Sequence, residues 1–78
     1  MKISFTKHAK EMLLQRKIEE AKVIKCINEP DKVLDPKDNK NIFIKDFGKN
    51  FLKVIVAIEG ESYTVITLYW LAKKRLKK

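Results

Sequence analysis

The chain has 78 residues, of which 45% are hydrophobic and 36% are charged, and its formal net charge is +8. This length suits a single domain, and the hydrophobic share excludes disorder as the first interpretation. No apolar run approaches the roughly 20 residues that a membrane helix needs, and the first residues have no signal-peptide pattern, so we expect a soluble, cytoplasmic protein. The lone Cys26 cannot form an intramolecular disulfide, and we expect a buried thiol rather than a nucleophile.

The basic residues gather at the C-terminus. Five positive charges belong to one short stretch, which consists of Lys73, Lys74, Arg75, Lys77 and Lys78. The rest of the chain therefore carries a net charge of +3. Such a tail attracts phosphate at long range, although a purely solubilising terminus is an equal alternative. We predict one domain over residues 1–72 and a basic tail over residues 73–78, whose first three side chains bind nucleic acid.

A short strand and two helices are expected in the first part of the chain. Residues 2–5 alternate between polar and apolar side chains, as in a strand. Thr6 is a good N-cap, and residues 6–16 repeat their apolar side chains with helical spacing. Lys17 marks a break, after which we predict a second helix over residues 19–28 that ends before a proline.

The second part of the chain has the patterns of strands. Residues 32–34 are a weak candidate, whereas residues 41–47, 51–58 and 62–70 are rich in β-branched and aromatic side chains. The connections between these last three strands are so short that only antiparallel neighbours fit them. We therefore predict an α+β fold, with the two N-terminal helices packed on one face of an antiparallel sheet of three to five strands. The other face of the sheet is then free to bind a partner.

Several familiar kinds of site are excluded by the residue types. One His and one Cys match no zinc spacing, and the two glycines are too isolated to form a phosphate-binding loop. Neither Ser4 nor Ser62 has the surroundings of a catalytic triad. We therefore expect no metal ion and no cofactor.

The first predicted helix carries a histidine and an arginine on one flank. His8, Met12 and Arg16 follow each other at steps of four residues, which places His8 and Arg16 roughly 12 Å apart along the helix. A histidine near a helix N-terminus is biased toward the neutral form, which suits a general base. The alternative is structural: His8 then binds a backbone carbonyl, and Arg16 caps the helix or pairs with a carboxylate.

The strands offer a set of cationic and hydroxyl-bearing side chains, namely Lys45, Lys53, Tyr63, Thr67 and Tyr69. By the alternation of a regular strand, Tyr63, Thr67 and Tyr69 share one side. If that side faces away from the helices, aromatic rings and hydroxyls lie beside lysines, which is a surface suited to RNA. The opposite register would expose Ile66, Leu68 and Trp70, and half-buried tyrosines with no binding role are a further alternative.

The chain resembles a family known as domain of unknown function 4258. The resemblance is carried by Phe5-Thr6-Lys7-His8-Ala9, Met12, Arg16-Lys17-Ile18, Pro30-Asp31-Lys32-Val33, Leu52-Lys53-Val54-Ile55-Val56 and Val65-Ile66-Thr67-Leu68-Tyr69. Together these segments cover nearly the whole chain except the basic tail. The family has a glycine after its arginine, where this chain has Lys17.

The resemblance implies a relation to the RelE, ParE and BrnT toxins, which place a helix pair on a sheet. RelE-like members are metal-independent endoribonucleases that cleave mRNA, often on the ribosome, and are neutralised by an antitoxin. ParE-like members keep the fold but act on gyrase. The resemblance also implies that His8 and Arg16 are the family's typical polar residues and that Thr67 is its late-strand threonine. Tyr69 and Arg75 match the C-terminal tyrosine and arginine of RelE loosely.

The first functional prediction is therefore an endoribonuclease that cleaves RNA by attack of a ribose 2′-OH. His8 would be its base or acid, Arg16 or Lys53 would hold the phosphate, and Tyr69 or Thr67 would be a positioning donor. Its partners would be RNA, including ribosome-bound mRNA, and a small antitoxin, but no membrane; a homodimer is left open. The alternatives are a non-catalytic ParE-like or RNA- or protein-binding module of the same fold, and a structural domain whose open face a partner covers.

Overall fold

The computed structural model describes residues 2–35 and 39–72. Its elements, in chain order, are β1 (Lys2–Phe5), α1 (Lys7–Arg16), α2 (Glu20–Asn28), β2 (Lys32–Leu34), β3 (Lys40–Asp46), β4 (Asn50–Glu59) and β5 (Ser62–Ala72). The α+β class is confirmed, and both helices and the last three strands lie within two residues of their predicted bounds. The predicted basic tail, residues 73–78, lies outside the described residues.

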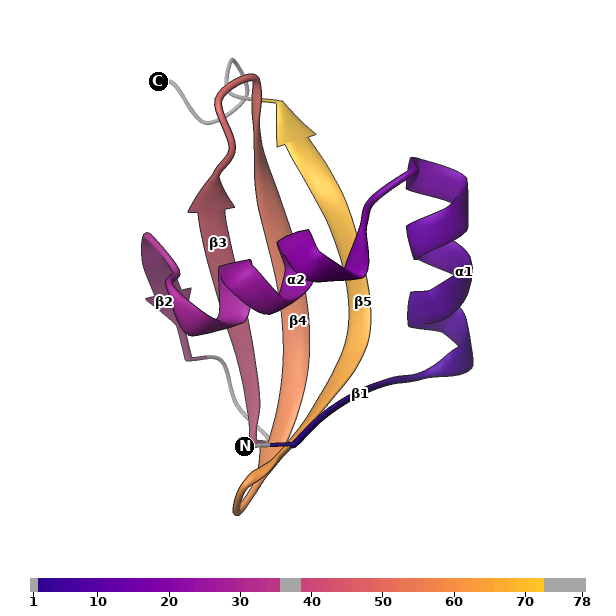
Figure 1. Ribbon diagram of the computed structural model, residues 1–78. Coiled ribbons are helices and arrows are strands. Elements are labelled where there is room, and N and C mark those ends of the chain that lie inside the picture. Colours follow the sequence, from indigo (N-terminus) through magenta and orange to yellow (C-terminus); the bar gives the residue numbers. More distant parts are fainter. Residues whose placement is uncertain (1, 36–38, 73–78) are drawn as a thin grey trace.

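The five strands form one sheet in the order β1-β5-β4-β3-β2 (Figure 1). The pairs β2–β3, β3–β4 and β4–β5 are antiparallel, as predicted. The prediction of a wholly antiparallel sheet is wrong, however, because β1 pairs parallel with β5, with Lys2 opposite Ser62 and Phe5 opposite Val65. Parallel neighbours need a long connection, and here all the elements from α1 to β4 lie between the two strands. The sheet is therefore mixed.

The first helix begins and ends with clear local signals. The Thr6 hydroxyl accepts a hydrogen bond of 3.0 Å from the backbone N–H of Ala9, which is the contact of an N-cap. At the other end Lys17 has a φ of 54° and a ψ of 50°, and its N–H donates to the carbonyls of Leu13 and Leu14. This left-handed residue stops α1 and turns the chain toward α2.

The hydrophobic core lies between α2 and the sheet and extends under α1. In Figure 1, α2 crosses in front of the strands, whereas α1 lies beside β5. The buried cluster consists of Ala9, Leu13, Ile18, Val23, Cys26, Ile27, Phe43, Leu52, Val54, Val56, Val65 and Leu68. Within the described residues, neither helix is long and apolar enough to cross a membrane.

The rear face of the sheet is left uncovered by the described helices, and we call it the open face. Its central side chains are all half-buried and consist of Ile42, Ile44, Phe51, Lys53, Ile55, Thr67, Tyr69 and Leu71. Each of them directly precedes or follows, on its own strand, a residue of the buried cluster or Trp70. This alternation is what divides the sheet into a dry face and a solvent-facing one.

Candidate functional site

A bulge in β5 decides which of its side chains reach the open face. Val65 pairs with Val56 and Thr67 pairs with Ile55, so Ile66 is an extra residue without a partner on β4. The extra residue shifts the alternation of side chains along β5. Val65 before it is buried in the core, whereas Thr67 after it lies on the open face.

This shift corrects one prediction about the site. Tyr63 lies two residues before Val65 and packs against the buried cluster, so it does not share a face with Thr67 and Tyr69. In the same strand Leu68 is fully buried and Trp70 packs against the core. The alternative register, with Leu68 and Trp70 facing outward, is therefore excluded.

Thr6 fixes the start of α1 to the bulge. Its backbone N–H donates to the carbonyl of Val65 at 3.0 Å, and its hydroxyl donates to the carbonyl of Ile66 at 3.1 Å. Val65 pairs with Phe5, the last residue of β1, so Thr6 binds β5 at the point where β1 ends and α1 begins. The side chains of the first turn of α1 are thereby placed at one border of the open face.

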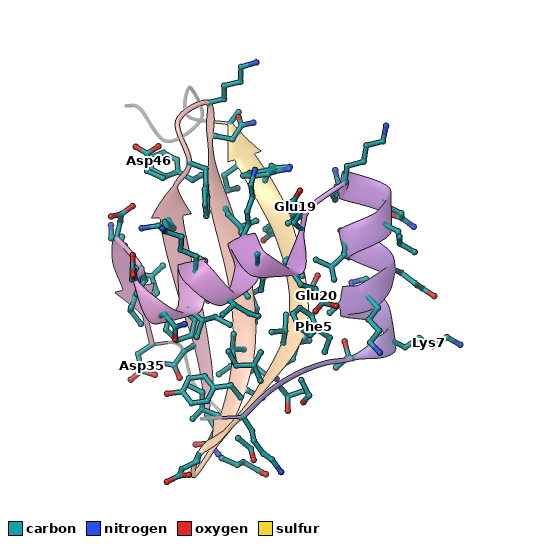
Figure 2. The ribbon with its side chains drawn as sticks, in the orientation of Figure 1. Phe5, Lys7, Glu19, Glu20, Asp35 and Asp46 are labelled. Atoms are coloured by element: carbon teal, nitrogen blue, oxygen red, sulfur yellow. The ribbon has the colours of Figure 1, made fainter. Side chains whose placement is uncertain are left out.

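His8 reaches the open face from this first turn. Its Nε2 lies 3.1 Å from the hydroxyl oxygen of Thr67, and the two residues are 59 positions apart in the sequence. The imidazole is exposed, so it remains accessible from solvent. A threonine hydroxyl both donates and accepts, so it can pair with either neutral tautomer of the ring. Lys7, the neighbour of His8, points away from the sheet (Figure 2).

Lys53 and Tyr69 extend the site along the same face. They are paired across β4 and β5, and the ammonium nitrogen of Lys53 lies 5.4 Å from the centre of the Tyr69 ring. Tyr69 follows Thr67 by two residues, so their Cα atoms are roughly 7 Å apart on one side of the strand. We call His8, Thr67, Tyr69 and Lys53 the open-face row. All four were predicted as site residues, and the fold brings them together.

Arg16 is not part of the open-face row. It is the last residue of α1, it is exposed, and within the described residues no hydrogen bond or ion pair joins it to another side chain. It lies eight residues after His8, which corresponds to roughly 12 Å along the helix axis. The predicted joint action of His8 and Arg16 thus has no contact to support it.

Lys45 was predicted to bind nucleic acid beside the tyrosines, and this placement is wrong. It pairs with the buried Leu52, and its ammonium group donates a hydrogen bond of 2.8 Å to the carbonyl of Glu29, just after α2. A cation is favourable at a helix C-terminus, so Lys45 has a structural role on the helix side. Of the other predicted nucleic-acid ligands, Lys73, Lys74 and Arg75 lie outside the described residues.

Cys26 is buried, as predicted, and its thiol is held in the core. Its Sγ lies 3.7 Å from the carbonyl oxygen of Leu52. Burial raises the pKa of the thiol from 9.0 to about 12, although the nearby charge of Lys45 lowers it in part. A neutral, enclosed thiol is a poor nucleophile. Among residues 2–35 and 39–72, no three His, Cys, Asp or Glu side chains gather as ligands of a metal ion would.

The sequence did not point to Lys32, which the fold places in line with the open-face row. Lys32 pairs with Ile44, Ile44 pairs with Lys53, and Lys53 pairs with Tyr69. The one available signal was the alternation of Lys32, Val33 and Leu34, which is too short to define a face. Thr6 was recognised as an N-cap, but its bond to Ile66 depends on the bulge, which no local pattern predicts.

Comparisons with known proteins identify a family and nothing finer. Neither the curated proteins nor the solved structures include one that matches the chain. Residues 5–70 match the family described as domain of unknown function (DUF4258). This range covers most of the chain and contains the whole open-face row. The chain therefore belongs to the domain of unknown function (DUF4258) family.

Proposed function

We propose that the protein cleaves RNA, as the toxin of a toxin–antitoxin system with a RelE-like fold, and that the open-face row is its active site. The observation that supports this most directly is the hydrogen bond between His8 Nε2 and the Thr67 hydroxyl. It holds an exposed imidazole at the border of a sheet face that also carries Lys53 and Tyr69. A base, a cation and an aromatic ring beside one another suit the binding and cleavage of RNA.

In the proposed mechanism the Thr67 hydroxyl pairs with the tautomer of His8 that carries its proton on Nε2. If the hydroxyl oxygen accepts the Nε2–H of the ring, Nδ1 is left without a proton. The neutral ring then has one nitrogen that is held by the protein and one that can accept a proton from a substrate.

The proposed reaction is a metal-independent transfer of the phosphoryl group from O5′ to O2′ within the RNA chain. Nδ1 of His8 removes the proton from a ribose 2′-OH, the oxygen attacks the adjacent phosphorus, and the O2′–P bond forms while the P–O5′ bond breaks. The ammonium group of Lys53 neutralises the charge that develops on the phosphate. The hydroxyl of Tyr69 gives its proton to the departing O5′. The products are a 2′,3′-cyclic phosphate and a 5′-hydroxyl.

A small antitoxin partner and a cytoplasmic location belong to the same proposal. They are supported by the relation to the RelE, ParE and BrnT toxins that the family resemblance implies, and by the order of the elements, in which two helices precede the antiparallel strands β3, β4 and β5. Expression of the protein by itself is then expected to arrest bacterial growth. Coexpression of its antitoxin, which would be sought in an adjacent gene, is expected to restore growth.

The experiment that tests the proposed activity uses one RNA oligonucleotide and copies of it with a single 2′-deoxyribose. The purified protein is expected to cleave the RNA in EDTA and to leave a 2′,3′-cyclic phosphate, which mass spectrometry identifies. Replacing the ribose before the cleaved bond by 2′-deoxyribose should abolish cleavage at that bond, while a 2′-deoxyribose elsewhere should not.

Cleavage that tolerates the 2′-deoxyribose, or that yields a 3′-hydroxyl, would rule out attack by the 2′-OH. A purified protein that binds the RNA and leaves it intact would favour the non-catalytic alternative. In that case growth arrest without RNA cleavage would direct the search toward a protein target, as for ParE.

A further inference from the structure

A line of register partners crosses the open face from β5 to the sheet edge at β2. Tyr69, Lys53, Ile44 and Lys32 stand opposite one another on four neighbouring strands. Since neighbouring strands are about 4.8 Å apart, Lys53 and Lys32 are separated by roughly 10 Å with an apolar residue between them. The line therefore continues the open-face row with a lysine, an apolar side chain and a second lysine.

A groove of about 560 Å³ lies along this line. Its apolar walls are formed by Leu34, Ile44, Phe51 and Leu71, and the lysines of the line also border it. Lys53 thus belongs both to the open-face row and to the groove. If a molecule binds Lys53 through a phosphate, the part of the molecule next to that phosphate lies directly over the groove.

We propose that this groove binds one unstacked base of a single-stranded RNA, next to the phosphate that is cleaved. The inference rests on the proposed function and adds the form of the substrate to it. Lys53 holds the cleaved phosphate, Lys32 holds a neighbouring phosphate, and the base lies between them against Phe51, Ile44 and Leu71. A base inside a duplex is stacked and paired, so it cannot enter the groove. Single-stranded RNA is thereby selected.

The charges around the groove favour a nucleotide over an apolar protein segment. Two of the lining side chains are lysines, whereas the one acid is Asp31, whose carboxylate already accepts a hydrogen bond of 2.8 Å from the backbone N–H of Asp46. The volume is within the range of roughly 300–1,000 Å³ that is typical of small-ligand sites. Apolar and aromatic walls beside cations are also the usual surface for single strands, because each base has a stacking face and each link has a charge.

Two neighbouring residues of β2 provide a matched test. Leu34 lines the groove and is 41% exposed, while Val33 is 47% exposed and does not line it. Leu34→Asp and Val33→Asp therefore add the same charge to the same edge strand at a similar level of exposure. The probe is a fluorescent RNA oligonucleotide with 2′-methoxy groups, which cannot undergo 2′-OH attack, so binding is measured without cleavage. Melting curves of both variants show whether either has lost its fold.

Leu34→Asp is expected to weaken binding of the single strand roughly tenfold, as the loss of one base contact does, while Val33→Asp stays within about twofold of the parent. Lys32→Gln should weaken binding, and Lys25→Gln, on the exposed side of α2, should have little effect. The corresponding duplex should not compete. Equal binding by the Leu34 and Val33 variants, or competition by the duplex, overturns the inference.

The outcomes separate the groove from the chemistry. If the groove variants lose binding but the parent does not cleave natural RNA, the groove is still the base site, whereas the proposed activity, and with it a cleaved phosphate beside the base, is wrong. If the parent cleaves RNA and Leu34→Asp binds and cleaves equally well, the activity stands and the groove is not the base site. A parent that binds no single strand overturns both, and a dimer that Leu34→Asp dissociates would show that a second copy occupies the groove.

Discussion

The hydroxyl of Thr6 donates a hydrogen bond of 3.1 Å to the carbonyl of Ile66, which is the extra residue of the β5 bulge. The same oxygen accepts the N–H of Ala9 and so caps α1. One side chain therefore starts the helix and fixes it to the strand that carries Thr67. Because His8 is two residues after Thr6, we expect this tether to position the imidazole against the Thr67 hydroxyl.

Replacing Thr6 by Val should therefore affect both stability and the site. The variant keeps the shape of the side chain but loses the cap and the tether, and loss of an N-cap alone costs about 0.5–2 kcal/mol of unfolding free energy. Denaturant titration measures that loss, and ¹⁵N shifts of the His8 ring report on its bond to Thr67. Thr6→Ser, which keeps the hydroxyl, should restore both properties. An unchanged His8 ring in Thr6→Val would show that the tether does not position it.

Replacing Lys17 by Gly should stabilise the protein. Lys17 has a φ of 54°, a left-handed conformation that costs a residue with a Cβ atom roughly 1 kcal/mol and costs glycine little. We expect a gain of up to about 1 kcal/mol, measured by chemical unfolding. Lys10→Gly, in the middle of α1, is the control and should destabilise by a similar amount. A loss of stability in Lys17→Gly would mean that its side chain makes a compensating contribution.

The elements that could be predicted from the sequence are those with local causes. The cap at Thr6, the break at Lys17 and the short turns at Gly48 and Gly60, which both have a positive φ, define helices and hairpins within a few residues of chain. The parallel pairing of β1 with β5 has no such cause. It joins Lys2 to Ser62 across the whole fold, and four residues of alternating pattern do not reveal a strand's direction.

The candidate site was predictable as a set of residue types but not as a surface. His8, Lys53, Thr67 and Tyr69 were selected by their chemistry and by the family resemblance, and the fold brings them together. Tyr63 was misplaced because one bulge reverses the alternation of β5, and a bulge depends on contacts with another element. Lys45 was misplaced for a different reason: its long side chain reaches beyond the core to a helix end.

The buried thiol of Cys26 should make stability fall at high pH. Its pKa is raised by burial from 9.0 to about 12, so the unfolded chain loses the proton first and is favoured as the pH rises between those values. The free energy of unfolding of the parent, relative to Cys26→Ala, is therefore expected to fall from about pH 9 upward. Contributions that are the same in both proteins cancel in the difference. A difference that does not change with pH would indicate that the thiol ionises in the folded state as it does in the unfolded one.

Deleting residues 73–78 should weaken the binding of all RNA sequences alike. We expect the five positive charges of this stretch to contact phosphates without reading bases, and each phosphate contact releases counterions. The slope of log K against log salt should decrease by up to about 3.5 for a single strand if all five make contact. Fluorescence anisotropy at several salt concentrations measures it. Unchanged affinity and slope would mean that the tail only keeps the protein in solution.

Lys53 lies in the open-face row and Arg16 does not, so replacing these two cations should have unequal effects on cleavage. Lys53→Gln removes the charge that we propose stabilises the phosphate, and it is expected to slow cleavage roughly 10²–10³-fold. Arg16→Gln, at the exposed end of α1, is expected to change the rate less than about threefold. Single-turnover rates on the same oligonucleotide measure both. If both variants lose the same factor in cleavage rate, the joint role of His8 and Arg16 that the sequence predicted would regain support.

The most direct test of the central claim is the cleavage rate of His8→Gln compared with that of Lys7→Gln. Both residues are exposed in the first turn of α1, but His8 bonds to Thr67 while Lys7 points away from the sheet (Figure 2). We predict that His8→Gln loses roughly 10²–10⁴-fold in single-turnover cleavage of RNA and melts within a few degrees of the parent, because its lost group is a general base rather than a core contact. Lys7→Gln should cleave at the rate of the parent. A His8→Gln variant that cleaves as fast as the parent would contradict the assignment of the open-face row as the active site.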